Sequence, residues 1–146
     1  MRELIRRLVE TDGPSGAEEP IRAVIRAEVE SLADELRVDP LGSLVVRKQG
    51  ADGRRGGEGQ RIVLDAHMDE IGVMVTYVDE KGFARFTRIG GVGALTCVGA
   101  RVAFADGTMG VIGVEAKREK PNEVPKFDQL YIDVGATGRD DCAVHV

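Results

Sequence analysis

One segment, RIVLDAHMDEIGVMV at residues 61–75, constrains the fold of this chain more than any other. It joins two apolar runs through a short polar stretch that contains His67, Asp69 and Glu70. A short apolar run without alternation, here residues 61–66, is typical of a strand that is buried on both faces. Such strands occur in sheets that helices cover. The segment therefore predicts an α/β sheet with His67 at the end of a strand.

The residues before this segment alternate between helical and strand patterns. Residues 1–10 and 17–33 carry apolar side chains at helical spacing. Ser15 is expected to cap the second helix, with Glu18 as the returning half of a capping box. Residues 35–48 are predicted to form two short strands around a Pro-Leu-Gly turn.

The residues after position 70 have the pattern of short antiparallel strands. Residues 72–91 predict a hairpin that turns at Asp79 to Gly82, and residues 100–114 predict a second hairpin centred on Asp106-Gly107. Residues 129–136 predict one more strand. Glycine-rich residues 49–60 and charged residues 115–128 are expected to be loops. The chain therefore divides near residue 70.

The pair formed by His67 and Asp69 is the candidate functional site. In an extended segment, residues two apart point to the same side, and a carboxylate commonly orients a metal-binding histidine. This favours half of a metal site. The alternative is a partly buried histidine that bonds a neighbouring acid and fixes a turn, and the spacing alone leaves both open. Glu70 points to the other side and is expected to be structural. The second histidine, His145, has no matching ligand spacing.

Composition and charge argue against other classes of function. No apolar run reaches the length of a membrane span, and no secretory signal is evident, so a cytoplasmic location is expected. The net charge is −5 with acids and bases interspersed, which disfavours nucleic acid or anionic membrane as a partner. Cys97 and Cys142 fit no metal or redox motif and are expected to be free thiols. Neither a Cys or Ser triad nor a glycosidase carboxylate pair can be placed.

Five motifs in order resemble the N-terminal part of the tetrahedral (TET-type) dinuclear-metal aminopeptidases, the glutamyl/leucyl aminopeptidase family whose members are often labelled endoglucanase or cellulase-like. AHMDEIGVMV at 66–75 is the most specific match. VDPLGSLVV is similar to the family's Asp-x-x-Gly-Asn-Leu segment, with Ser43 where Asn is usual. The motifs are PSGAEE at 14–19, VDPLGSLVV at 38–46, AHMDEIGVMV at 66–75, GFARFTRIGGV at 82–92 and LYIDVGATGRDD at 130–141.

The resemblance implies a fold and an activity. Residues 1–69 would be the N-terminal part of a three-layer αβα metallopeptidase domain, and residues 70–146 an inserted small antiparallel β-barrel that mediates dimerisation. His67 would be a metal ligand and Asp69 the catalytic carboxylate that orients it. The family removes N-terminal residues from peptides with two divalent ions, for which zinc, cobalt and manganese are all suitable. Its dimers assemble into a hollow dodecamer.

The resemblance also implies that this chain supplies at most one ligand. The family's bridging Asp, its Glu-Glu pair, a further acid and its last His lie beyond the inserted domain, and this chain ends at Val146. The chain alone is therefore expected to be inactive, and residues 1–66 are expected to expose apolar surface. The alternative function is a non-catalytic module for self-association, formed by residues 70–146.

Overall fold

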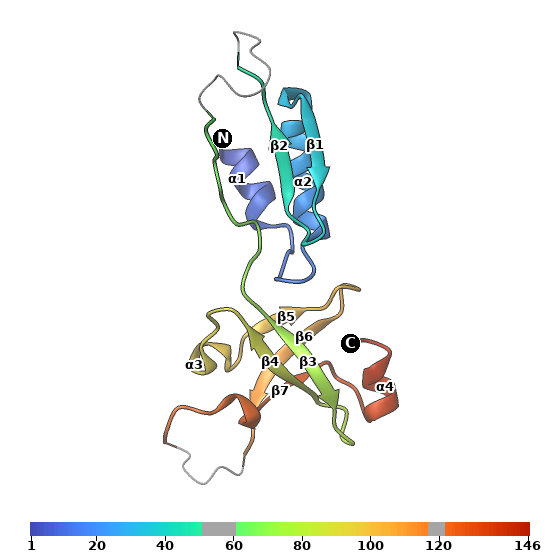
Figure 1. Ribbon diagram of the computed structural model, residues 1–146. Coiled ribbons are helices and arrows are strands. Elements are labelled where there is room, and N and C mark those ends of the chain that lie inside the picture. Colours follow the sequence, from blue (N-terminus) through green and yellow to red (C-terminus); the bar gives the residue numbers. More distant parts are fainter. Residues whose placement is uncertain (51–60, 117–121) are drawn as a thin grey trace. The chain divides into compact units, whose positions relative to one another are not determined.

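The chain has a mixed α/β fold that forms two compact units, Met1–Glu70 and Ile71–Val146 (Figure 1). The computed structural model describes residues 1–50, 61–116 and 122–146. The loop predicted at 49–60 lies almost entirely outside these residues, as does part of the loop predicted at 115–128. Among the described helices, none combines the length and the apolarity that crossing a bilayer requires.

The first unit begins with two helices, as predicted. Helix α1 spans Arg2–Val9, and α2 spans Glu19–Val29 before it tightens into a 3₁₀ turn, η1, at Glu30–Leu32. Helix α2 packs against α1 and buries Ile21. Among the described residues of this unit, Ile21 is the single large apolar residue that is fully buried, so the unit has a thin core.

A two-stranded antiparallel sheet follows the helices. Its two strands and the turn between them are as predicted. Strand β1 spans Glu35–Val38 and pairs with β2 at Leu44–Arg47. Asp39 holds the turn, because its Oδ1 accepts hydrogen bonds from the backbone N–H groups of Leu41 and Ser43 at 2.9 Å each. Strand β2 lies against α2.

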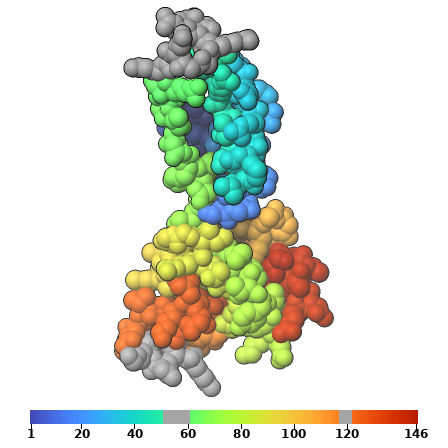
Figure 2. Space-filling model, in the orientation of Figure 1, coloured from blue at the N-terminus to red at the C-terminus, as the bar shows by residue number. Residues whose placement is uncertain are grey.

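The strand predicted at residues 61–66 is wrong for this chain. These residues are extended but belong to no strand, and Figure 2 shows them in green at the surface of the first unit. The exposed fractions of Ile62, Val63 and Leu64 are 83%, 86% and 94%. The apolar pattern favours burial, but a strand needs a neighbour to pair with its N–H and C=O groups. No described strand supplies one, so the apolar surface expected for this unit is exposed.

The second unit is built on a five-stranded antiparallel sheet. Both predicted hairpins are confirmed, β3 with β4 and β5 with β6, and the predicted last strand is confirmed as β7 between β4 and β6. The order across the sheet is β3-β4-β7-β6-β5 (Figure 1). The strands are β3 at Gly72–Val78, β4 at Ala84–Ile89, β5 at Arg101–Ala103, β6 at Met109–Val114 and β7 at Leu130–Asp133.

One apolar cluster holds the second unit together. It joins residues of β4, β6 and β7 to two short helices that the sequence analysis did not predict, α3 at Ala94–Cys97 and α4 at Arg139–Ala143. A 3₁₀ turn, η2 at Phe127–Gln129, precedes β7. The two cysteines are free, as predicted, and both are buried here. The buried members are Ala84, Phe86, Cys97, Ile112, Leu130, Ile132 and Cys142.

The predicted closure of this sheet into a barrel stays a prediction. Strands β3 and β5 are the two edges of the recorded strand order, and no pairing between them occurs in the part of the chain that the structure describes. In these residues the strands form a curled sheet with two edge strands.

Candidate metal-ligand site

The segment that follows residues 61–66 is held in place by the loop before α2. The backbone N–H of Glu70 donates to the carbonyl of Gly13 at 2.9 Å. The N–H of Gly13 in turn donates to Oε1 of Glu70, also at 2.9 Å. Pro14 and Glu70 form an isolated parallel bridge. Glu70 thus links its own segment to the loop before α2 through hydrogen bonds, which is the structural role expected for it.

A tight turn at residues 14–17 places Ser15 next to the segment that contains Asp69. The N–H of Ala17 donates to the carbonyl of Pro14 at 2.8 Å, and Gly16 has a φ of +94°. This is the turn geometry that requires glycine at its third position. The turn displays Ser15 at its second position, and the Ser15 hydroxyl donates to Oδ2 of Asp69.

The predicted capping box is therefore wrong. Helix α2 starts at Glu19, two residues later than expected, with Glu18 at its N-cap and no side-chain cap. Oε1 of Glu18 accepts a hydrogen bond from the N–H of Gly16 at 2.7 Å. The Ser15 hydroxyl instead bonds a carboxylate, and hydrogen bonds to charged groups are roughly twice as strong as neutral ones.

His67 and Asp69 lie together, as the sequence analysis predicted. Nδ1 of His67 is 3.0 Å from Oδ1 of Asp69 and 3.0 Å from the Asp69 carbonyl oxygen. The hydrogen bond from Ser15 and then the one from His67 lower the pKa of Asp69 below its usual value, because both favour the charged carboxylate. Each carboxylate oxygen of Asp69 thus has its own partner. The contact between Ser15 and Asp69 was not predicted from the sequence, where the local pattern favoured Ser15 as a helix cap.

The position of the proton on His67 follows from its neighbours. Both groups near Nδ1 are hydrogen-bond acceptors, so Nδ1 carries the proton. In the neutral ring the lone pair is then on Nε2. The side chain is 86% exposed, and no described residue bonds Nε2. A histidine fixed in this tautomer by a carboxylate is the usual form of a metal ligand.

The residues present fit one ligand of a metal ion, with an orienting carboxylate, and not a complete site. A protein zinc site needs three or four ligands from side chains. Among residues 1–50, 61–116 and 122–146, no three His, Cys, Asp or Glu side chains gather in a way that could hold a metal ion. His145 belongs to the second unit, where its backbone N–H donates to the carbonyl of Cys142.

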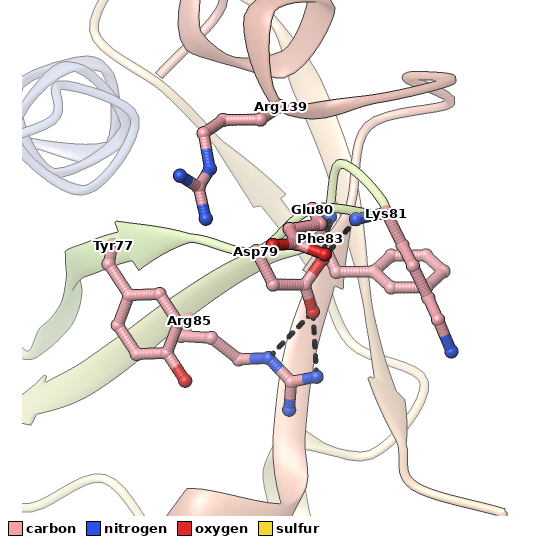
Figure 3. A pocket seen from close by; sticks show the side chains of 7 residues that line it. All are labelled: Tyr77, Asp79, Glu80, Lys81, Phe83, Arg85 and Arg139. Atoms are coloured by element: carbon pink, nitrogen blue, oxygen red, sulfur yellow. Dashed lines mark hydrogen bonds and ion pairs between the residues drawn. The ribbon is translucent and has the colours of Figure 1, made fainter.

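A shallow pocket of about 350 Å³ lies in the second unit, at the turn between β3 and β4 (Figure 3). Asp79 and Arg85 line this pocket, and Nη2 of Arg85 donates to Oδ2 of Asp79 at 2.8 Å. The same Nη2 also pairs with Oε1 of Glu115 at 2.6 Å. Oδ1 of Asp79 accepts the N–H groups of Lys81 and Phe83. The charges of Asp79, Arg85 and Glu115 therefore satisfy one another, which is typical of a structural ion pair.

Comparison with known proteins assigns the family. The family model for M42 glutamyl aminopeptidase matches residues 42–145. A relative from Acetivibrio thermocellus is 42% identical over 141 residues, which cover 97% of this chain and 40% of the relative. The chain belongs to the M42 aminopeptidase family, and the resemblance seen in the sequence is confirmed.

Solved structures agree with this assignment. An aminopeptidase from the archaeon Desulfurococcus kamchatkensis matches with a TM-score of 0.85 and 32% identity, over 99% of this chain and 40% of that one. The TET1 peptidase of Pyrococcus horikoshii, which can assemble into a tetrahedron or a large octahedral shell, matches with a TM-score of 0.82 and 31% identity. That match covers 99% of this chain and 43% of the other. This chain thus spans about 40% of the length of such relatives.

Proposed function

We propose that His67 is a metal ligand, and Asp69 its orienting carboxylate, in a metal-dependent aminopeptidase site. One observation carries this proposal. The hydrogen bonds at Nδ1 leave the lone pair of Nε2 free and exposed, which is what a metal ligand requires. Membership of the M42 family supports the same reaction, removal of N-terminal residues from peptides.

The proposed cofactor is a pair of divalent ions, of which this chain contributes one ligand. A nitrogen ligand next to a carboxylate suits zinc, cobalt and manganese. When bound, such ions activate a water molecule and polarise the scissile carbonyl. Asp69 would hold the His67 ring in place throughout the reaction. A single ligand cannot position two ions, so the chain alone should not hydrolyse peptides.

The proposed domain boundary lies one residue before the boundary between the two compact units. Residues 1–69 would belong to the catalytic α/β domain, and residues 70–146 would form the inserted β-barrel that mediates dimerisation. The substrates would be peptides with a free N-terminus, the protein would act in the cytoplasm, and dimers would build a larger hollow assembly such as a dodecamer. The assembly reported for the TET1 peptidase supports this last step.

A self-association module without catalysis is the second candidate function. Within the described residues, β3 and β5 each pair with a strand on one side only, and the β3 side chains of Met74 and Tyr77 are exposed. Such edges are sites for pairing with another chain. Solution mass from light scattering tests this candidate. A strictly monomeric chain would contradict it.

The metal-ligand proposal is tested by titrating the chain with Zn²⁺ while the imidazole resonances are followed by NMR. The chain has two histidines, so a His67→Ala variant assigns the signals and His145 reports binding elsewhere. We expect Zn²⁺ to shift the His67 resonances, and the shift to be reversed by EDTA. No response at His67 at millimolar Zn²⁺ would refute its role as a ligand.

A peptide assay tests the number of ligands. The chain is incubated with short free-N-terminus peptides and zinc, cobalt or manganese, with EDTA and His67→Ala as controls. We expect no cleavage by mass spectrometry. Metal-dependent trimming that His67→Ala abolishes would show that this chain or its oligomer holds a complete site.

A further inference from the structure

The contact between Ser15 and Asp69 links residues 54 positions apart in the chain. Asp69 uses Oδ1 for His67 and Oδ2 for Ser15, so both carboxylate oxygens are engaged. The torsion that orients a carboxylate is a soft one with broad minima. A carboxylate bonded at one oxygen can still swing, whereas one bonded at both is fixed in its plane.

The loop that carries Ser15 is held by backbone contacts that do not involve the bond from Ser15 to Asp69. The paired hydrogen bonds between Gly13 and Glu70 hold the loop, and the turn that ends at Ala17 shapes it. Gly13 also packs closely on the helix, since a Cβ at this position would lie 2.5 Å from Cγ2 of the buried Ile21. Removal of the Ser15 hydroxyl should therefore leave the loop where it is.

We propose that Ser15 is a positioning residue that locks the Asp69 carboxylate, so that the His67 proton stays on Nδ1 and Nε2 faces outward for a ligand. The meaning of this lock for metal binding rests on the proposed function, whereas the lock itself rests on the hydrogen bonds. The chain of contacts runs from the Ser15 hydroxyl through the carboxylate to the imidazole ring. Ser15 acts through Asp69 and touches no ligand itself.

Loss of the hydroxyl should weaken the lock without abolishing it. In Ser15→Ala, water would take the place of the hydroxyl at Oδ2, because Asp69 is partly exposed. The carboxylate could then turn away from Nδ1. The Asp69 carbonyl would still accept from Nδ1, so part of the preference for this tautomer would remain. Groups that orient a metal ligand typically change affinity by about 10- to 100-fold, and the exposed setting here predicts a smaller effect, about three- to tenfold.

The test uses three variants of the full chain. Ser15→Ala removes the hydroxyl, and Ser15→Thr restores one at the same position. Ser31→Ala is the matched control, because Ser31 is exposed in η1 and its side chain makes no hydrogen bond among the described residues. Long-range ¹H–¹⁵N correlation spectra give the His67 tautomer without metal, at about pH 8 where histidine side chains are ordinarily neutral. A Zn²⁺ titration of the same samples gives the affinity at His67.

We expect the Nδ1–H tautomer of His67 to dominate in the parent chain, in Ser15→Thr and in Ser31→Ala, and its share to fall in Ser15→Ala. Affinity for Zn²⁺ at His67 should fall about three- to tenfold in Ser15→Ala, with the response of His145 unchanged. The amide spectrum should otherwise be preserved. Threonine rescue separates a role of the hydroxyl from a general effect of the substitution.

Two failures can be distinguished by these measurements. An unchanged His67 tautomer in Ser15→Ala, with Zn²⁺ still bound as in the parent chain, would overturn the role of Ser15 and leave the metal-ligand proposal standing. A tautomer that changes in Ser15→Ala while Zn²⁺ never shifts His67 would confirm the lock and refute the metal-ligand proposal. Equal effects of Ser15→Ala and Ser31→Ala would also overturn the role of Ser15.

Discussion

Replacement of Asp79 by asparagine separates the two roles of this carboxylate in the second unit, which are to stabilise a turn and to form an ion pair. Oδ1 accepts the N–H groups of Lys81 and Phe83 at 3.0 and 3.1 Å and so shapes the turn between β3 and β4. Oδ2 accepts Nη2 and Nε of Arg85 at 2.8 and 3.2 Å. Asparagine keeps an oxygen for the turn but presents an NH₂ group to the guanidinium. Asp79→Asn therefore removes the ion pair alone.

The size of the effect follows from burial and from the remaining partner. The side chains of Asp79 and Arg85 are 21% and 17% exposed, so the pair is mostly shielded from water. Hydrogen bonds to charged groups are worth about 1.5–3 kcal/mol. Arg85 keeps its ion pair with Glu115, which limits the cost of leaving it unpaired. We expect Asp79→Asn to lower the free energy of unfolding by about 1–2 kcal/mol, and Asp79→Ala by about 2–4 kcal/mol because the turn is lost as well.

Urea unfolding followed by tyrosine fluorescence measures this unit specifically. The chain has no tryptophan, and its two tyrosines, Tyr77 and Tyr131, both belong to the second unit. Asp106→Asn is the matched control. Asp106 accepts the N–H and hydroxyl of Thr108 at 2.8 Å each in the other hairpin turn, and it has no ion pair among the described residues. Equal losses for the two asparagine variants would refute the role given to the ion pair.

The pH dependence supplies a second check with a defined sign. Partial burial raises the pKa of Asp79, but the hydrogen bonds from Arg85 and from the turn lower it more, so the net direction is downward. A lowered folded-state pKa means that the stabilisation is complete above the unfolded value, about 3.9, and is lost as the pH falls through the folded value. The gap between the parent chain and Asp79→Asn should therefore close in acid. A gap that stays constant down to about pH 2 would contradict the mechanism.

Three further predictions concern the core, the thiols and the exposed apolar run. Ile132→Ala should lower the free energy of unfolding by about 2–4 kcal/mol, because Ile132 is 1% exposed and its removal leaves a cavity. The same tyrosine assay measures this loss, and a loss below about 1 kcal/mol would argue against tight packing. Cys97 and Cys142 should react slowly with a thiol reagent in the folded chain and rapidly in urea, because burial raises the pKa of both thiols; fast labelling of the folded chain would contradict this. Val63→Lys should reduce the binding of the dye ANS, since Val63 is exposed in an apolar run; unchanged fluorescence would place the dye elsewhere.

Much of the second unit was predictable, because two of its four described strand pairings are hairpins whose strands are close in sequence. Strands β3 and β4 are joined by the turn at Asp79, and β5 and β6 by the turn at Asp106-Gly107. Alternating side chains and turn residues determine such hairpins locally. The short helices α3 and α4 have only four and five residues, too few for a periodic pattern to be recognised. They form by packing Cys97 and Cys142 into the core.

The same reasoning failed for residues 61–66, because a segment becomes a β-strand only when a neighbouring strand pairs with its backbone N–H and C=O groups. The run Ile62, Val63 and Leu64 has the composition of a buried strand, and composition reports only a tendency to leave water. Hydrogen-bonding partners must come from elsewhere in the fold. In the described residues of this unit the sheet ends at β1 and β2, and neither lies beside the run as a paired strand. The prediction therefore required a neighbour that local sequence could not supply.

In the candidate site, one contact was predictable from residues close in sequence and the other was not. His67 and Asp69 meet because they are two residues apart in an extended segment, so their contact was predictable from spacing. The contact of Ser15 with Asp69 depends on a loop 54 residues away, and the local pattern favoured a helix cap instead. All three residues lie within the first unit, and their geometry depends on contacts made inside it. The ring of His67 should therefore keep its tautomer and orientation whether or not the other ligands are in place, which is why the tautomer can be tested in this chain by itself.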